Sequence, residues 1–332
     1  MGYSTLLEVQ DLVKYFEVYT RGVVSRKKVG DVHAVDHVDF VVGKGETLAL
    51  VGESGCGKTT TAKVVLDLEP PTSGKVIFDG LDVFETFRKG KKADRFKLRR
   101  SMQLVFQNPY LSLDPRMTVY DILSEPFVIQ KHVPKAEWTE RVYRLLEMVG
   151  LEAYHAERYP HEFSGGQRQR VSIARALAVE PKLVVADEPV SSLDVSIRAQ
   201  ILNLMIDLQN KVQLSYLYIS HDLSSVRQIS HRVAVMYLGE FVELGDTERV
   251  FGKPLHPYTQ ALMSAIPIPD PDTKVQRIIL PGEVPSPINP PPACRFHPRC
   301  PYAKDICKAE KPAWTDAGYG HWVSCHFWKD FA

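Results

Sequence analysis

The sequence lacks the long apolar runs and the charge imbalance that would mark several protein classes at once. Its apolar segments, such as VDFVV at 38–42 and KLVVA at 182–186, are far too short to span a bilayer. Its first ten residues lack the basic and then apolar pattern of a secretory signal. The 41 Lys and Arg residues nearly balance the 40 Asp and Glu residues, so nucleic acid is not an expected partner. We therefore expect a protein of the cytosol.

Cysteine is scarce except near the end of the chain, where four of the five cysteines fall within residues 294–325. In a cytosolic chain such clustering indicates metal or redox chemistry more than structural disulfides. Four thiolates can hold a [4Fe–4S] cluster or a Zn²⁺ ion, and the spacing C-x5-C-x6-C-x17-C lacks the C-x-x-C pairs usual for zinc ribbons. The predicted ligands are Cys294, Cys300, Cys307 and Cys325, with His297, His321 and His326 as possible substitutes.

Strand-like and helix-like segments alternate over much of the chain. An apolar strand at 46–52 precedes a helical segment at 58–68. Similar strands at 182–186 and 214–220 flank a helical segment at 195–211. This alternation predicts βαβ units around a mostly parallel sheet, and hence an α/β fold.

Two parts of the chain depart from this alternation. Residues from about 109 to 163 carry apolar residues at helical spacing, with Gly150 as a predicted helix stop, and indicate a helical insertion. From residue 267 onward proline is dense, which marks a linker or a loop-rich appendage. We predict a main domain over 1–250 and a C-terminal extension over 251–332.

The sequence GESGCGKT at 52–59 matches the phosphate-binding P-loop, G-x-x-x-x-G-K-S/T, between an apolar strand and a helix. Its glycines let backbone N–H groups point at phosphate oxygens, and the helix N-terminus adds partial positive charge. Lys58 is expected to reach the β- and γ-phosphates of a nucleotide such as ATP, and Thr59 to bind Mg²⁺. Cys56 occupies a variable position and is interpreted as a small side chain without a chemical role. The predicted nucleotide-binding residues here are Gly52, Glu53, Ser54, Gly55, Cys56, Gly57, Lys58, Thr59 and Thr60.

Two adjacent carboxylates end the apolar strand LVVADE at 183–188. Asp187 is expected to hold Mg²⁺, and Glu188 to orient the attacking water or accept its proton. Gln107, predicted to end the strand MQLVFQ at 102–107, is a candidate for contact with the metal or the water. His221, after a third such segment, is a candidate for the γ-phosphate. The predicted chemistry is phosphoryl transfer to water.

A second phosphate-binding segment, Ser164-Gly165-Gly166, opens another predicted helix, although the P-loop is already complete. Taken in order, the motifs resemble those of the ATPase subunit of ABC transporters: the P-loop, Gln107, FSGGQ at 163–167, LVVADE, SSLD at 191–194 and SHD at 220–222. The resemblance implies a P-loop ATPase fold with an antiparallel β subdomain and a helical subdomain over about 109–163.

The resemblance also explains the second phosphate-binding segment. In this family two ATPase subunits meet head to tail, and each ATP lies between the P-loop of one and the SGGQ segment of the other. Ser164, the Gly165 and Gly166 amides and Gln167 are then expected to cap the partner's γ-phosphate. Asp194 is expected at the interface, and Phe16 is expected to stack on adenine.

The segments FGKPLHPYTQALMSAIP at 251–267 and CRFHPRCPYAKDIC at 294–307 resemble the tail of oligopeptide and dipeptide importers. That resemblance implies two transmembrane permease subunits, a second ATPase that is a sister chain or another copy, and, indirectly, an extracellular solute-binding protein. It implies a place at the cytoplasmic face of the cell membrane, and it favours a structural [4Fe–4S] cluster. A zinc ion and free or disulfide-linked thiols are the alternatives. Oligosaccharide and nickel importers use the same type of ATPase and are the alternatives.

Two other classes of function compete with an importer. One is a soluble ABC protein that acts on ribosomes or DNA, but those proteins carry two cassettes or long insertions, and this chain has neither. The other is a regulatory subunit that binds ATP without hydrolysing it, which the intact Lys58, Asp187, Glu188 and His221 argue against.

Overall fold

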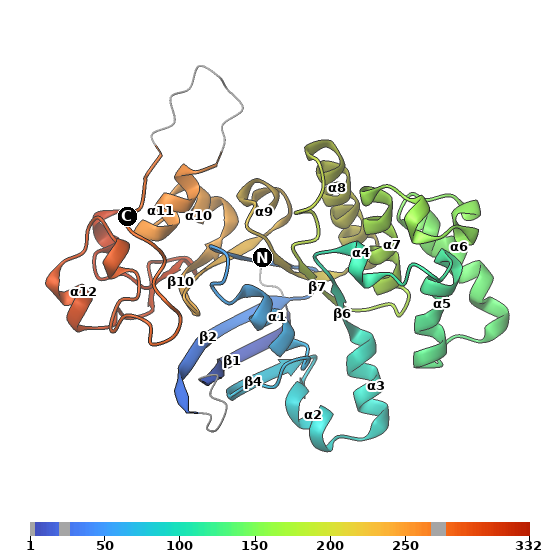
Figure 1. Ribbon diagram of the computed structural model, residues 1–332, viewed down its shortest axis with the longest axis horizontal. Coiled ribbons are helices and arrows are strands. Elements are labelled where there is room, and N and C mark those ends of the chain that lie inside the picture. The colour runs from blue at the N-terminus through green and yellow to red at the C-terminus, as the bar shows by residue number, and fades with distance from the viewer. Residues whose placement is uncertain (1–3, 20–26, 267–276) are drawn as a thin grey trace. The chain divides into compact units, whose positions relative to one another are not determined.

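The computed structural model describes residues 4–19, 27–266 and 277–332 (Figure 1). The chain divides into two compact units, and each mixes helices and strands as the alternating segments predict. Unit 1 comprises Met1–Leu7, Val41–Thr47 and Ile77–Ser220, and unit 2 comprises Glu8–Phe40, Leu48–Val76 and His221–Ala332. The predicted domain boundary at residue 250 falls inside unit 2 and stays a prediction.

One group of strands in unit 2 contains the strand that leads into the P-loop. These strands are β3 (Thr47–Val51), β9 (Arg232–Tyr237), β10 (Glu240–Asp246), β11 (Thr315–Asp316) and β12 (Trp322–Val323). β3 and β9 are parallel, with Ala49 opposite Val233. β9, β10, β12 and β11 follow in antiparallel pairs. The two short strands near the C-terminus were not indicated by the sequence pattern.

A second sheet contains the N-terminal strands, in the order β2-β1-β4. Their bounds are β1 (Thr5–Tyr19), β2 (Lys28–Gly43) and β4 (Ser73–Phe78). Toward the end of β2, Val38 and Phe40 are buried whereas Asp39 and Val41 are exposed. This alternation places one face of the strand against the core and leaves the other in solvent.

The helices of unit 2 are short. They are α1 (Lys58–Val65), α9 (Leu223–Ile229), α10 (Thr247–Gly252), α11 (Pro257–Ser264) and α12 (Asp305–Ala309), with 3₁₀ turns at His297–Arg299 and Trp328–Asp330. Three of these helices have a side chain that caps the N-terminus. Asp222, Asp246 and His256 accept hydrogen bonds from backbone N–H groups of the first turn. Residues 267–276, the start of the predicted proline-rich segment, lie outside the described residues.

Unit 1 contains three parallel strands, in the order β8-β7-β6. Their bounds are β6 (Met102–Val105), β7 (Leu183–Asp187) and β8 (Ser215–Ile219). Every residue of β7 and β8 is buried. The helix α8 (Val195–Val212) connects β7 to β8, which confirms the predicted parallel βαβ unit.

The helical insertion predicted over 109–163 is confirmed. The remaining elements of unit 1 are β5 (Leu81–Asp82), α2 (Val83–Lys89), α3 (Lys92–Ser101), α4 (Pro109–Ser112), α5 (Val119–Gln130), α6 (Trp138–Met148) and α7 (Gly165–Leu177), with 3₁₀ turns at Lys135–Glu137, Ala153–Glu157 and Pro160–Glu162. Gly150 adopts a φ angle of 70° just after α6, as expected of a helix stop. α5, α6 and α7 pack against one another (Figure 1).

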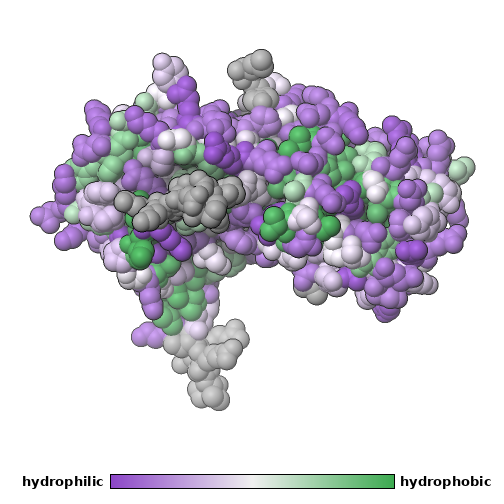
Figure 2. Space-filling model, turned by 90° about the horizontal axis from the view of Figure 1, so that it is seen from above, coloured by the Kyte–Doolittle hydropathy of each residue, from purple (hydrophilic) through white to green (hydrophobic). Residues whose placement is uncertain are grey.

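Apolar side chains form no large continuous patch on the face that Figure 2 shows, where hydrophilic residues cover most of the surface. Within the described ranges, no helix is both long enough and apolar enough to cross a membrane. Exposed large apolar residues such as Val195 and Tyr319 lie on separate elements.

Candidate functional site

The P-loop lies in unit 2, between β3 and α1. Gly52 and Gly57 adopt φ angles of 150° and 113°, which glycine tolerates far better than other residues. A Cβ atom on Gly52 would lie 2.2 Å from the Met236 carbonyl oxygen on β9, and one on Gly57 would lie 2.0 Å from that of Ala34 on β2. The loop is thus pressed against two strands, and its path requires glycine at both positions.

Lys58, the first residue of α1, places its ammonium group inside the loop. It is only 6% exposed and donates to the carbonyl oxygens of Gly52 at 2.8 Å and Glu53 at 3.0 Å. No side chain caps α1, so the first N–H groups of the helix and the lysine together form a cationic end. Burial raises the pKa of the neighbouring Cys56 thiol, which agrees with its predicted lack of a chemical role.

The outer side of the loop and the first turn of α1 are accessible. Ser54, Gly55 and Thr59 are exposed, and Thr60 is partly exposed. An anion can therefore approach the helix N-terminus from solvent. The individual roles assigned to these residues stay predictions.

Of the two neighbouring aromatic residues on β1, Phe16 is the one available for a base. Its ring is 36% exposed, and the Lys14 ammonium lies 4.6 Å from the ring centroid. Tyr15 is instead held by a hydrogen bond that its hydroxyl donates to the buried carboxylate of Asp36. Burial and that hydrogen bond raise the pKa of Tyr15. The stacking role predicted for Phe16 is compatible with this arrangement.

His221 belongs to unit 2 and is exposed. It immediately precedes Asp222, whose carboxylate accepts the N–H of Ser224 at 3.1 Å and begins α9. The position just before a helix cap is consistent with the predicted contact to a γ-phosphate, which stays a prediction.

In unit 1, the carboxyl end of β7 carries the two predicted acidic residues. Asp187 is 9% exposed and lies opposite Ile219 of β8. The N–H of Glu188 donates to the Ile219 carbonyl oxygen at 2.8 Å. Glu188 has a φ angle of 48°, in the left-handed region, which strains a residue other than glycine by about 1–3 kcal/mol.

Gln107 meets Glu188 directly. The Gln107 side-chain amide donates to the Glu188 carboxylate at 2.7 Å across 81 residues of sequence. The structure therefore brings together the two residues predicted to act on the attacking water. One detail of the prediction is wrong, because β6 ends at Val105 and Gln107 lies in the loop after it.

The segment Ser164–Gln167 forms the start of α7. The Ser164 hydroxyl accepts the Gln167 N–H at 3.3 Å, and the Gln167 side chain accepts the Ser164 N–H at 3.0 Å. This capping box fixes the first turn of the helix. Phe163, just before it, is 4% exposed and packs in the interior.

Gly165 and Gly166 face α8. A Cβ atom on Gly166 would lie 2.4 Å from Cγ2 of Ile197, and one on Gly165 would lie 3.4 Å from Cδ2 of Leu193. Gly166 is therefore needed for close packing of α7 against α8, whatever ligand the helix start binds.

Asp194 forms the N-cap of α8. Its carboxylate accepts the Ile197 N–H and the Ser196 hydroxyl, both at 2.9 Å. These hydrogen bonds lower the pKa of Asp194. The sequence analysis assigned Asp194 to a subunit interface, which stays a prediction, and did not foresee its capping role.

The four C-terminal cysteines line one small cavity in unit 2. None forms a disulfide. Burial is the main cause that raises the pKa of Cys294 to about 12 and that of Cys325 to about 11. The neighbouring cysteines raise both pKa values further. Burial also raises the pKa of Cys300. Isolated thiolates are therefore disfavoured here, and a bound cation would relieve that cost.

The predicted metal centre is not preformed. In the described part of the chain, no group of three or more His, Cys, Asp or Glu side chains is arranged to hold a metal ion. The three nearby histidines have other hydrogen-bond partners: His297 Nδ1 lies 2.9 Å from the Cys294 carbonyl oxygen, His326 Nε2 lies 3.0 Å from that of Glu310, and His321 Nε2 lies 2.7 Å from the Glu243 carboxylate. His297 and His326 line the cavity together with the four cysteines, whereas His321 does not.

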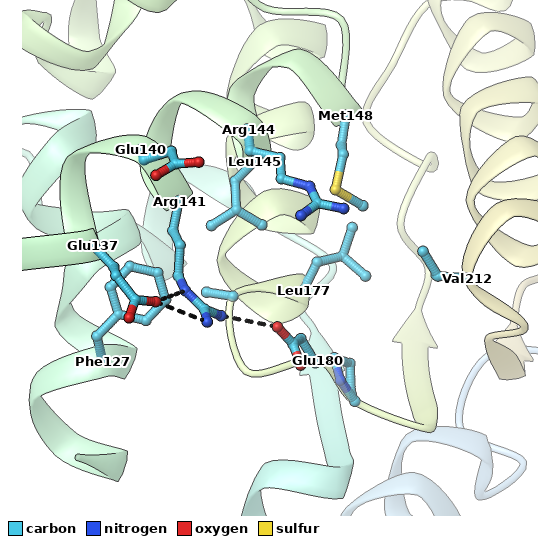
Figure 3. Close-up of a pocket in the computed structure, with 12 residues that line it drawn as sticks. Phe127, Glu137, Glu140, Arg141, Arg144, Leu145, Met148, Leu177, Glu180 and Val212 are labelled. Carbon is cyan, nitrogen blue, oxygen red and sulfur yellow. Dashed lines mark hydrogen bonds and ion pairs between the residues drawn. The ribbon is translucent and has the colours of Figure 1, made fainter. Parts of the chain in front are cut away.

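A larger cavity, of about 450 Å³, lies among the helices of unit 1. Arg141 on α6 crosses it and pairs with Glu137 at 3.2 Å and Glu180 at 3.0 Å, as Figure 3 shows. Phe127, Leu145 and Leu177 supply apolar walls. Gln107 is not among the residues that line this cavity.

Three residues that hold these motifs were missed by the sequence analysis. Arg168 on α7 donates to the Pro160 carbonyl oxygen at 2.6 Å and stacks over the Tyr110 ring at 3.9 Å. Tyr258 and Arg299 both contact Glu53 of the P-loop. Tyr258 and Arg299 lie 205 and 246 residues from Glu53, so no local pattern could have identified those two contacts.

Two known families match parts of this chain. The family described as ABC transporter matches residues 35–191, and the family described as oligopeptide/dipeptide transporter, C-terminal region, matches residues 242–307. The second match includes Cys294, Cys300 and Cys307.

Curated relatives are similar over almost the whole chain. It is 50% identical to the oligopeptide transport ATP-binding protein AppF of Bacillus subtilis, with 98% of each chain covered. It is 48% identical to the dipeptide transport ATP-binding protein DppF of Escherichia coli, with 96% of this chain and 93% of that one covered.

Solved structures share the fold over about three quarters of the chain. One is cbiO1 of Clostridium perfringens, described as part of the ABC transporter complex cbiONQ, with a TM-score of 0.63 and 27% identity over 75% of this chain and 91% of that one. Another is the dimeric ATP-binding cassette MJ0796 bound to ADP and Pi, with a TM-score of 0.62 and 26% identity over 73% of this chain and 99% of that one.

Proposed function

The chain belongs to the family of ABC transporter ATP-binding proteins, and on that premise we propose that it hydrolyses ATP to energise the import of di- and oligopeptides. Its α/β fold is that of the ABC-type P-loop ATPases. The observation that carries the proposal is the 50% identity with AppF over 98% of both chains. The hydrogen bond between Gln107 and Glu188 supports hydrolysis as well as binding.

ATP binds at the P-loop. Lys58 turns from the carbonyl oxygens of Gly52 and Glu53 toward the β- and γ-phosphates, and the N–H groups at the start of α1 face the same phosphates. Phe16 stacks on the adenine through its exposed ring. Thr59, Asp187 and Gln107 would hold Mg²⁺, since each supplies the oxygen ligands that this ion prefers. Bound with the nucleotide, the ion would supply positive charge that offsets the charge of the phosphates.

Glu188 orients the water that attacks the γ-phosphate, or accepts its proton. Gln107 donates to the Glu188 carboxylate and so limits its orientation. The left-handed backbone at Glu188 supports this role, because strained residues that persist are often functional. His221 contacts the γ-phosphate.

A second ATPase subunit completes each site. Ser164, Gly165, Gly166 and Gln167, with the N-terminus of α7, cap the γ-phosphate held by the partner's P-loop. Asp194 lies along the shared interface. The dimeric form of the structural relative MJ0796 supports this arrangement. The partner is a sister ATPase or a second copy of this chain.

The ATPase pair acts on two transmembrane permease subunits, from a peripheral position on the cytoplasmic face of the membrane. An extracellular solute-binding protein selects the peptide and acts indirectly. The transport roles named for AppF and DppF support these partners.

The C-terminal extension, residues 251–332, carries a [4Fe–4S] cluster on Cys294, Cys300, Cys307 and Cys325. A cluster would cross-link this loop-rich segment, as metals do in small domains with little core. The shared cavity supports it. Anaerobic purification tests this: brown protein with about four irons per chain supports a cluster, and colourless protein with one zinc rejects it.

Uptake assays test the proposed function. Cells that lack this chain should fail to accumulate labelled di- and oligopeptides, and the wild-type chain should restore uptake. A Lys58→Ala chain, which removes the phosphate-binding ammonium, should not restore it. Restored uptake of an oligosaccharide or nickel, with no effect on peptides, would contradict the peptide assignment.

A further inference from the structure

The four-cysteine segment reaches the P-loop through an ion pair. Arg299, directly before Cys300, donates from its two terminal nitrogens to the two carboxylate oxygens of Glu53, at 2.8 and 3.2 Å. Arg299 is 7% exposed. A two-pronged pair of this kind fixes both distance and orientation, which a lysine could not do.

The same region also holds the backbone of Glu53. The Glu53 N–H donates to the Tyr258 hydroxyl at 2.9 Å. Tyr258 is fully buried, and its ring packs against those of Tyr237 and Phe296 at centroid distances of 4.7 and 5.5 Å. Phe296 and Arg299 both belong to the cysteine segment. The segment therefore supplies one group that anchors Glu53, Arg299, and packs against the other, Tyr258.

Local turns fix Arg299 relative to the cysteines. The Arg299 N–H donates to the Phe296 carbonyl oxygen at 3.0 Å, and the His297 N–H donates to that of Cys294 at 3.0 Å. The Cys294 N–H in turn donates to the Cys307 carbonyl oxygen at 3.2 Å. The position of the Arg299 guanidinium therefore depends on the folded conformation of the cysteine segment.

A second arginine makes a parallel contact beside the predicted adenine site. Arg295, directly after Cys294, donates to the Leu238 carbonyl oxygen and to the Asp36 carboxylate. Asp36 also accepts the hydroxyl of Tyr15, the neighbour of Phe16. Both arginines beside the cysteines thus connect the segment to the nucleotide-binding part of unit 2.

The charge of Glu53 gives the Arg299 contact a specific consequence. Glu53 is one of the residues of the loop that receives the phosphates. An unpaired carboxylate there would repel a polyphosphate and would let the loop depart from its anion-binding shape. Arg299 neutralises that charge and holds the loop in place.

Resting on the proposed ATP site, we propose that Arg299 is a positioning residue for nucleotide binding, which makes ATP affinity depend on the cysteine segment. Arg299 does not contact the nucleotide itself and acts through Glu53 alone. The four-cysteine segment thereby serves the ATP site in addition to its own stability.

The test is titration of the purified full-length chain with a fluorescent ATP analogue and Mg²⁺, with adenosine as a second ligand. The variants are Arg299→Met, Glu53→Gln and the two together. Lys311→Met is the matched control, because Lys311 pairs with Glu240 at 2.7 Å from the same C-terminal region and has no contact with Glu53. Circular dichroism and melting temperature report whether each variant folds.

Arg299→Met should weaken ATP-analogue binding about tenfold, within the usual range for coupling between sites. The double variant should regain most of the lost affinity, because Glu53→Gln removes the unpaired charge. Adenosine binding and the Lys311→Met control should stay unchanged. A merely structural role of Arg299 would weaken adenosine binding too and would not be rescued by Glu53→Gln.

Equal ATP binding by the wild type and Arg299→Met, or no rescue in the double variant, overturns the inference. If Arg299→Met does not fold, Arg299→Gln takes its place, because it also removes the positive charge beside Glu53 but keeps a polar side chain. Its affinity for the ATP analogue should fall about tenfold with adenosine binding unchanged, and wild-type affinity for the ATP analogue overturns the inference. A wild-type chain that binds no ATP would contradict the proposed function itself, whereas the other outcomes concern Arg299 only.

Discussion

At the scale of single residues, Glu188 is held by two independent constraints. Its backbone adopts a φ angle of 48°, and its carboxylate accepts the Gln107 amide at 2.7 Å. A carboxylate that must orient a water benefits from such pre-organisation, because no reorganisation is then needed during the reaction.

Glu188→Gln should lower the rate of ATP hydrolysis by about 10²–10⁴-fold, the range typical of a general base, while ATP binding survives. Phosphate release measured beside nucleotide titration checks both parts. Glu180→Gln is a matched control, because Glu180 has a similar φ angle of 54° and pairs with Arg141 instead. Unimpaired hydrolysis, or lost ATP affinity, in Glu188→Gln would contradict the assigned role.

Asp36 predicts a pH effect on stability. Burial opposes its charge, but hydrogen bonds from Tyr15 and His33 and the charge of Arg295 outweigh burial and hold the pKa of Asp36 at about 2. A carboxylate with a lowered pKa in the folded state stabilises the fold above its unfolded pKa, about 3.9, and loses that contribution as pH falls toward the folded value. In urea unfolding, the wild type should therefore exceed Asp36→Asn in stability at pH 5, and the difference should shrink by pH 3. A difference that grows as pH falls would contradict this.

The residues found from sequence and those missed differ in one physical respect. Lys58, Asp187 and Glu188 lie at fixed positions within local motifs, and their elements were predicted from the same segments. Arg299 lies 246 residues from Glu53, and only the folded chain brings them together. The sequence drew attention to the cysteines beside Arg299 and gave no reason to consider the arginine.

At the scale of elements, the start of α7 joins two requirements. Its capping box needs Ser164 and Gln167, and its packing against α8 needs the absence of a side chain at Gly166. The first requirement is local and visible in the sequence. The second depends on Ile197, which comes from another helix.

Gly166→Ala should destabilise the fold by about 1–3 kcal/mol, since its Cβ would lie 2.4 Å from Ile197 Cγ2. Chemical unfolding measures this cost. In an Ile197→Ala background, which removes the clashing methyl group, the same glycine substitution should cost less than half as much. An equal cost in both backgrounds would show that the contact with Ile197 does not require the glycine.

Other elements show what the sequence pattern could and could not provide. β3, α1 and β7 match apolar runs and motif positions closely. β1 and β2 extend well beyond the short apolar segments LLEV at 6–9 and VDFVV at 38–42, because polar and partly exposed residues continue both strands. β11 and β12 have two residues each, too few for a period to be recognised.

At the scale of the whole molecule, each of the two compact units combines stretches that are far apart in the sequence. Unit 2 contains the P-loop and residues 221–332, whereas unit 1 contains β7, α7 and the helical insertion. The predicted division at residue 250 follows the stretch that the ATPase motifs cover and the start of the segment that resembles an importer tail. The ion pair of Arg299 with Glu53 shows why composition alone does not reveal which segments pack together.

The central claim is that one molecule carries only part of the hydrolytic site. Its P-loop binds ATP, but hydrolysis also needs the start of α7 from another subunit. The direct measurement is the ATP hydrolysis rate per chain, compared between a strictly monomeric sample and the assembled importer at saturating ATP. We predict that the monomer binds ATP yet hydrolyses it at least about a hundredfold more slowly, as loss of transition-state contacts implies. Equal rates per chain in the two samples would contradict the account.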